Sequence, residues 1–186
     1  MSRRCLAFLI LAAASPAVTA AGLDLNVNSD AARVIGDLDL SNNLRVDGSY
    51  FHHQDNGDVI GGGVHLTGDA SGGRSPVNAG LGGRLFYIDS DTRARDSGTV
   101  LALGGYAEYT FPEFDRFSVG GHVHYAPGVL SFGDVDDYLE YGAWAGYSVL
   151  RNGVVYLGFR RMEAGFDGTP DVTFDSGAHL GLRLRF

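Results

Sequence analysis

Two histidines separated by one residue, His122 and His124, are the side chains of this sequence best spaced to act together. Residues i and i+2 of a β-strand lie on one face, so both imidazoles can reach a single metal ion. Glu108 and Glu140 fall on the flanking predicted strands and could join them. The alternative is a polar pair that holds no metal. We predict this alternative, with no metal site and no cofactor.

Serine-based hydrolysis or acyl transfer is the second chemistry that we considered. It needs a histidine base within reach of a hydroxyl group. His124 is followed by Tyr-Ala-Pro, with no serine two residues later, and nothing marks Ser118 or Ser131 as a nucleophile. We therefore expect that the protein is not an enzyme and has no catalytic residue.

The acidic segment 133–137 spaces its carboxylates in a way that suits Ca²⁺, which prefers oxygen ligands. It lacks the remainder of an EF-hand loop. We expect solvated acidic loops here, and acidity of this kind also makes divalent bridging to lipopolysaccharide plausible.

The last ten residues indicate the kind of element that carries these side chains. Apolar residues alternate strictly with small or polar ones, and the chain stops on an aromatic residue. One face of this strand is therefore apolar and the other is charged. Such a strand is typical of the closing strand of a bacterial outer-membrane β-barrel, where it acts as an assembly signal. The residues that we assign to this signal are Leu180, Leu182, Leu184 and Phe186.

Similar alternation recurs along the chain and predicts about ten strands. Most of these runs approach the roughly 9–11 residues that a tilted membrane strand needs. The fold class is therefore all-β, an antiparallel up-and-down transmembrane β-barrel, with eight strands as the alternative if the first two runs form an irregular segment. The predicted strands are 23–27, 34–40, 44–50, 60–67, 79–87, 101–111, 117–125, 138–149, 155–160 and 177–186.

The connections between these strands fall into two classes, as in bacterial barrels with short periplasmic turns and longer outer loops. The first class is mostly tight and comprises 41–43, 68–76, 112–116 and 151–153. The second class is mostly longer, is rich in Asp, and comprises 29–33, 51–58, 89–98, 126–137 and 164–176. Aromatic residues gather near both ends of the strands and predict two girdles in the headgroup zones. The outer girdle would contain Tyr50, Tyr87, Tyr125 and Tyr141, and the inner one Tyr109, Phe111, Phe117, Tyr147 and Phe186.

The N-terminal residues read as a secretory signal peptide, with a basic start, a short apolar run and small residues near its end. We expect residues 1–20 to be removed and residues 21–186 to form one domain. The only cysteine, Cys5, lies in the removed part, so the mature domain cannot depend on disulfides. The net charge of −8 argues against a nucleic acid partner.

In a membrane barrel the polar face of the strands lines the lumen. We consider two arrangements of this lining: a packed network of ion pairs, or a narrow polar channel. The packed arrangement predicts low single-channel conductance. The lining residues that we predict are Asp37, Asp39, Arg45, Asp47, His65, Arg84, Glu108, His122, His124, Glu140, Arg160, Arg183 and Arg185.

Several short motifs follow one another along the chain: the stretch from His53 to Asp58, the Gly-rich strand after it, the Tyr-Ala-Pro at 125–127, Asp137-Tyr138 and the alternating C-terminus. In these features the mature chain resembles the YfaZ family of small outer-membrane proteins. The resemblance implies an outer-membrane, porin-like barrel without a settled substrate, and it carries no catalytic residue to this sequence.

We therefore expect an outer-membrane β-barrel of Gram-negative type, with an envelope-structural role or narrow passage of small polar solutes. Its expected partners are outer-membrane lipid, lipopolysaccharide and the barrel assembly machinery. The rival is a soluble periplasmic, lipocalin-like protein that binds a small ligand, with its apolar residues turned inward. A lipid-modifying outer-membrane enzyme is a further alternative. Strand length, the terminal Phe and the loop asymmetry favour the membrane barrel.

Overall fold

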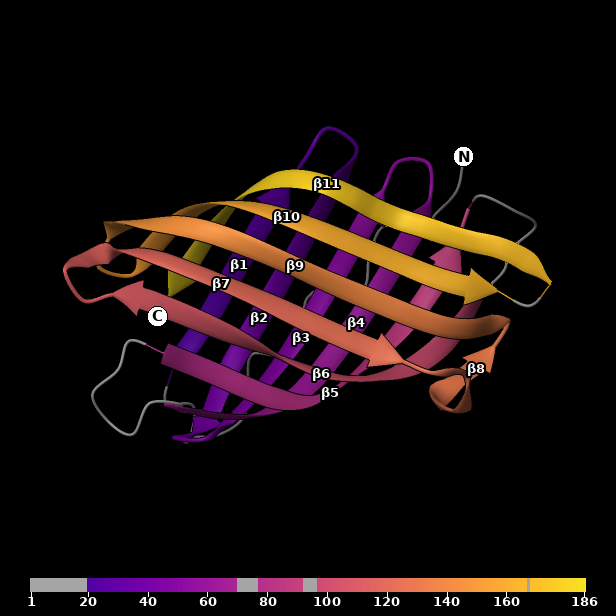
Figure 1. Cartoon of the computed structure of the whole chain (residues 1–186), viewed down its shortest axis with the longest axis horizontal. Coiled ribbons are helices and arrows are strands. Elements are labelled where there is room, and N and C mark those ends of the chain that lie inside the picture. The colour runs from indigo at the N-terminus through magenta and orange to yellow at the C-terminus, as the bar shows by residue number, and fades with distance from the viewer. Residues whose placement is uncertain (1–19, 70–76, 92–96, 167) are drawn as a thin grey trace.

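The computed structural model describes residues 20–69, 77–91, 97–166 and 168–186, and the predicted signal peptide lies almost wholly outside these ranges. Its wall consists of ten long antiparallel strands (Figure 1). These are β1 (Ala20–Val27), β2 (Ala31–Ser41), β3 (Leu44–His53), β4 (Gly57–Asp69), β5 (Val77–Ser90), β6 (Ser97–Phe111), β7 (Phe114–Ala126), β9 (Val135–Leu150), β10 (Gly153–Phe166) and β11 (Thr169–Arg185).

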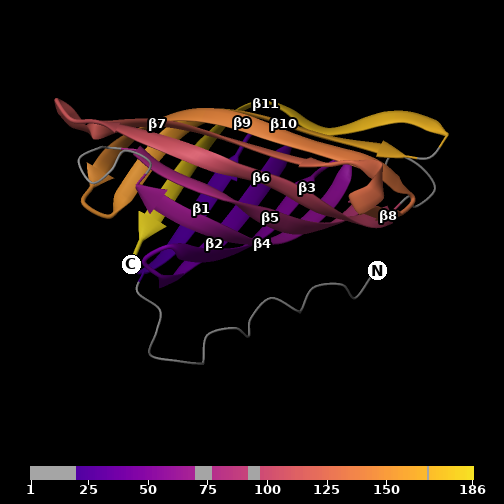
Figure 2. The same cartoon turned by 60° about the horizontal axis from the view of Figure 1, so that its bottom comes forward.

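The sheet closes on itself. Each strand pairs with its sequence neighbours, and β1 also pairs with β11, from Gly22↔Arg185 to Val27↔Leu180. All ten predicted strands are therefore confirmed, and the alternative of eight strands is wrong, because β1 and β2 are full members of the wall. Strands of the near and far walls cross in Figure 2, which reflects the tilt that barrel closure requires.

A short insertion lies between β7 and β9 and was not expected from the sequence. A 3₁₀ turn (η1, Gly128–Leu130) leads into β8 (Ser131–Gly133). β8 pairs with the first residues of β6, from Gly98↔Gly133 to Val100↔Ser131, and so extends the wall where β7 has ended. The predicted loop 126–137 is therefore partly structured. No helix within the described ranges has the length and apolar character needed to cross a bilayer.

Two of the predicted outer loops are wrong in extent. In the first, β3 runs to His53 and β4 begins at Gly57, so only a tight turn joins them. In the second, β10 and β11 continue as a paired hairpin across most of 164–176, with Ala164↔Val172 and Phe166↔Thr169 in register. The physical reason is that the inward side chains of these extensions pack together inside the barrel. Parts of two other predicted connections, 70–76 and 92–96, lie outside the described residues.

The outer surface of the wall is apolar. On β4, for example, Ile60, Val64 and Leu66 are exposed, whereas His65 between them is buried. Aromatic side chains are exposed near both ends of the strands, as the two predicted girdles require. Tyr50 differs from the others, because it is half-buried and its hydroxyl donates to Asp58. The exposed members are Tyr87, Tyr125 and Tyr141 at one end, and Tyr109, Phe111, Phe117, Tyr147 and Phe186 at the other.

Glycine is required where neighbouring strands approach most closely. A Cβ at Gly82 would overlap the carbonyl oxygen of Val64 on β4, and a Cβ at Gly104 would overlap that of Val123 on β7. Both overlaps involve backbone atoms, which cannot rotate away as a side chain can. These positions therefore allow β4–β7 to curve tightly.

Candidate functional site

The interior of the barrel is the candidate site, because every predicted lumen-lining residue is buried or half-buried there. His65, Arg84, His124, Glu140 and Arg160 are each at most 5% exposed. The others are half-buried: Asp37, Asp39, Arg45, Asp47, Glu108, His122, Arg183 and Arg185. Inward residues alternate with outward apolar ones along each strand, so one regular pattern positions the whole lining.

The most buried charge is the Glu140 carboxylate on β9, which has no exposed surface. The Arg33 guanidinium on β2 donates to its Oε1 across the lumen. The hydroxyl of Tyr138 donates to Oε2 at 2.9 Å, and Nε2 of His122 lies 3.1 Å from Oε1. Three side chains from three strands therefore satisfy one carboxylate, as a buried charge requires.

A second group joins β3, β4, β5 and β7. Nη2 of Arg84 lies 2.6 Å from Oδ1 of Asp47, and Nδ1 of His65 lies 3.2 Å from Oδ2. Arg84 also donates to the hydroxyl of Ser49 at 2.9 Å. Nε2 of His65 faces Nε2 of His124 at 3.4 Å. His124 therefore meets His65 across the lumen, and its ring centre also lies 6.1 Å from that of His122.

A third group joins β1, β6, β9, β10 and β11. The Arg183 guanidinium donates to Asp24 at 3.0 Å and to Glu108 at 2.9 Å, and it stacks 4.6 Å above the ring of Trp144. The hydroxyl of Tyr156 donates to the same Asp24 carboxylate. The single tryptophan of the chain therefore faces the interior, against a cation.

Arg160 on β10 binds two partners, one on the adjacent strand β11 and one on β1 beyond it. Its Nε donates to Asp175 at 2.9 Å and its Nη1 to the amide oxygen of Asn26 at 2.7 Å. Nearer the predicted periplasmic turns, Arg45 donates to Asp39 at 2.6 Å, and Arg185 donates to Asp37 at 2.7 Å.

One end of the interior, next to the predicted outer loops, is apolar, which the alternation of the sequence did not predict. We refer to this end as the outer half of the interior. We call the buried residues there the apolar plug. They come from the outer ends of the strands and are Ala31, Phe51, Val59, Phe86, Ile88, Val100, Ala102, Ala126, Val135, Tyr138, Met162, Ala164, Phe166 and Phe174. Charged side chains therefore fill the centre of the interior and the end next to the short turns, whereas the other end is apolar.

We call the hydrogen-bonded groups around Glu140, Asp47, Arg183 and Arg160 the charged layers. Two arginines connect these layers to the apolar plug. The guanidinium of Arg84 lies 4.9 Å from the centre of the Phe86 ring, and that of Arg160 lies 5.0 Å from the centre of the Phe51 ring. Phe86 in turn packs on Tyr138 with ring centres 4.9 Å apart. A cation over an aromatic face is favourable, so the two layers hold each other in place.

Small cavities remain in the charged layers. One of ≈150 Å³ is lined by Asp37, Arg45, Glu108 and Arg185, among others. A second of ≈150 Å³ lies beside the His65–His124 pair and Glu140, and a third of ≈70 Å³ lies beside Arg160.

Within the described ranges, no group of three or more His, Cys, Asp or Glu side chains is arranged to hold a metal ion. In the acidic segment 133–137, Val135 is buried in the plug and begins β9, so the segment is not a free loop. Asp134 accepts from the Ser97 amide at 3.4 Å and Asp137 from the Gly165 amide at 3.2 Å.

Two interior residues matter that the sequence did not assign to the lining: Arg33 and Asp175. Arg33 precedes the start of the predicted second strand, and Asp175 fell in a predicted loop. One signal in the sequence indicates that β10 continues past residue 160, and that its partner β11 therefore starts earlier. Inward Arg160, Met162 and Ala164 alternate with less buried Arg161 and Glu163.

Three comparisons show which known proteins this chain is similar to. The family described as "YfaZ precursor" matches residues 1–186. Outer membrane protein YfaZ of Escherichia coli (strain K12) is 29% identical over 144 residues, covering 77% of this chain and 75% of that protein. A solved structure described as "Unveiling the Mechanism Behind the in-meso Crystallization of Membrane Proteins" has a TM-score of 0.42 and 10% identity, over 90% of this chain and 82% of that one. The chain belongs to the YfaZ family and is a β-barrel protein of the outer membrane.

Proposed function

We propose that this protein is a closed barrel with an envelope-structural role, rather than a pore. The observation that carries the proposal is the apolar plug. Phe51, Phe86, Tyr138 and Phe174 are at most 1% exposed and project inward from four different strands. A hydrated ion would have to shed its water to pass such a layer, at a cost of several kcal/mol or more.

The charged layers below the plug support the same role. Their arginines and carboxylates are mutually paired rather than lining an open path, and the cavities between them hold at most ≈150 Å³. Narrow passage of small polar solutes would require both the plug and these pairs to open. It is therefore the second candidate.

The rival lipocalin-like arrangement needs an apolar cavity and a polar outer wall. The exposed Leu66, Leu81, Leu157 and Leu180 favour the opposite arrangement, with lipid outside. We also propose that the protein is not an enzyme and that its charged interior is structural. Its proposed partners are membrane lipid, lipopolysaccharide and the barrel assembly machinery. Leu180 and Leu182 on β11 and Phe186 directly after it are exposed and are available to that machinery.

Planar-bilayer recording of the refolded mature protein tests the closed barrel. We expect no stable conductance steps from the wild type. The triple variant Phe51→Ala, Phe86→Ala, Phe174→Ala removes three rings of the plug and is expected to conduct more. Leu85→Ala with Leu103→Ala, two exposed positions on the outer wall, is the matched control and is expected to behave as the wild type. Large, stable, ion-selective steps from the wild type would overturn the proposal.

A further inference from the structure

The wall of the barrel is incomplete beside β11. This strand pairs with β10 from Thr169 to Leu184, but among the described pairings it meets β1 only from Leu180 to Arg185. β1 ends at Val27, and the chain then turns into β2 at Ala31. The part of β11 before Leu180 therefore has a strand on one side, and on the other side the wall is interrupted.

Side chains, rather than a backbone ladder, bridge this interruption. Nδ2 of Asn28 donates to Asp175 at 3.0 Å. Further toward the outside, Nδ2 of Asn56 donates to the carbonyl oxygens of Thr173 at 3.1 Å and Phe174 at 3.2 Å. A shift of register between Asp175 and Thr173 opposite Met162 and Glu163 places a β-bulge here, with Phe174 as the extra residue. Bulges re-aim side chains and are frequent beside binding sites.

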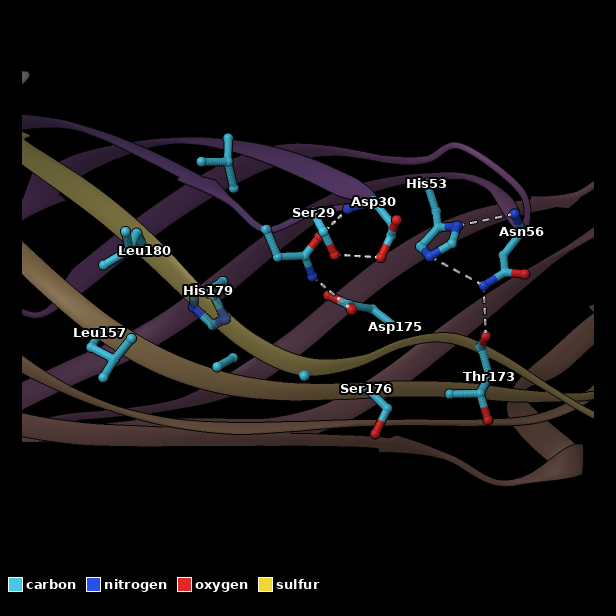
Figure 3. Close-up of a pocket in the computed structure, with 14 residues that line it drawn as sticks. Ser29, Asp30, His53, Asn56, Leu157, Thr173, Asp175, Ser176, His179 and Leu180 are labelled. Atoms are coloured by element: carbon cyan, nitrogen blue, oxygen red, sulfur yellow. Dashed lines mark hydrogen bonds between the residues drawn. The ribbon is translucent and has the colours of Figure 1, made fainter.

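The interruption holds a pocket of ≈610 Å³, a volume in the range of small-molecule sites. Figure 3 shows Leu157, Leu180 and His179 at one end, Asp175 in the middle, and His53 and Asn56 at the other end. We call this pocket the wall window. It joins two environments, because Leu157 and Leu180 are about 60% exposed toward lipid, whereas Asp175 and His179 are buried.

The polar lining of the wall window indicates what would bind. Among its described lining residues there is no arginine or lysine, while Asp30 and Asp175 bring carboxylates. His179 is only 8% exposed, and its Nδ1 has no hydrogen-bond partner within the structure. A buried polar atom without a partner is unfavourable, so a ligand that supplies one is stabilised. These groups suit a head that donates hydrogen bonds. Because Arg160 already pairs with Asp175, the carboxylate that disfavours an anion is that of Asp30.

We propose that the wall window binds one single-chain amphiphile from the membrane, with its acyl chain along Val27, Leu157 and Leu180. Its uncharged, hydroxyl-bearing head points inward to His179 and Asp175. This site does not depend on whether the lumen conducts. It goes beyond the structural role proposed above.

Gly177 allows a clean test, because it lines the wall window and a Cβ there would meet nothing within 4 Å. Gly177→Trp should therefore fill the pocket without disturbing the wall. Gly36→Trp is the matched control, since Gly36 on β2 also has nothing within 4 Å and lies outside the pocket. His179→Phe keeps a ring and removes the polar atoms.

The experiment is solution NMR of the ¹⁵N-labelled full mature protein in lipid nanodiscs, titrated with monomyristoylglycerol. Tetradecyl sulfate, with the same chain length and a permanent negative charge, is the second probe. We expect saturable shifts confined to residues 27–30, 53–56 and 173–180. Tetradecyl sulfate should bind at least about tenfold more weakly because of its charge. The glycerol lipid should bind His179→Phe at least about tenfold more weakly, because one good hydrogen bond is lost. It should also bind Gly177→Trp at least about tenfold more weakly, because the tryptophan ring fills the pocket. Gly36→Trp should bind as the wild type.

Three results would overturn the proposal. The first is a set of shifts that never saturate and spread over the whole outer wall, which indicates bulk lipid contact. The second is equal or tighter binding of tetradecyl sulfate. The third is unchanged binding by Gly177→Trp, with the folded state of each variant verified by its unboiled migration on a gel.

Discussion

Replacing Glu140 by glutamine is expected to lower the free energy of unfolding by about 3–5 kcal/mol, the usual cost of leaving a buried charge without its partner. Glu140 has no exposed surface, and Arg33, which donates to it, is 4% exposed. The amide of glutamine keeps the size of the side chain and removes the charge. Urea unfolding of the refolded barrel in detergent, followed by tryptophan fluorescence, measures the change.

Glu163→Gln is the matched control, because Glu163 pairs with Arg161 in a contact where both side chains are 25–38% exposed. A pair of this kind contributes about 0–1 kcal/mol. The double variant Arg33→Met, Glu140→Leu should recover much of the loss, since it removes both charges together. A loss below about 1 kcal/mol for Glu140→Gln would contradict a dry, buried Arg33–Glu140 pair.

Phe86→Ala is expected to cost about 3–5 kcal/mol, the range for removing a large ring from a packed core. Phe86 is 1% exposed, packs on Tyr138 and lies beneath the guanidinium of Arg84. The substitution removes these contacts and leaves a cavity between the apolar plug and the charged layers. The same urea unfolding measures the loss.

Phe159→Ala removes the same ring from the outer wall, where Phe159 is 45% exposed. Lipid fills the space that this ring leaves, so no cavity forms and the loss should be clearly smaller than for Phe86→Ala. Equal losses at the two positions would mean that the outer half of the lumen is not packed as described.

Much of this architecture could be predicted from residue alternation. The period of two identified all ten wall strands, including β1 and β2, and assigned both signs of charge to a single face. The pattern worked because lipid outside and polar groups inside impose opposite demands on successive side chains. Outward positions such as Leu157 and Leu180, and inward ones such as Glu140 and Arg160, follow it strictly.

The rest could not be predicted because it depends on packing between strands that are distant in sequence. Alternation separates two faces, but it does not reveal that Phe51, Phe86 and Phe174 meet inside the outer half of the barrel. These inward aromatic residues interrupt the polar pattern. Phe51 and Phe174 fall in predicted loops, whereas Phe86 lies within the predicted strand 79–87. The bulge at Phe174 also interrupts the period-two alternation of β11, so the alternation does not identify Asp175 as an inward residue. The contact between His124 on β7 and His65 on β4 likewise depends on two strands that are distant in sequence and do not pair with each other.

Trp144, the single tryptophan of the chain, allows a direct test of the claim that polar side chains face the interior and apolar side chains face lipid. Its ring lies under the Arg183 guanidinium inside the barrel, whereas the neighbouring Ala145 is exposed toward lipid. In bilayers of lipids brominated on the acyl chains, we expect little quenching of the native Trp144 fluorescence. The double variant Trp144→Phe, Ala145→Trp should instead be strongly quenched. Strong quenching of the native tryptophan together with weak quenching of the variant would contradict a barrel whose charged side chains face inward.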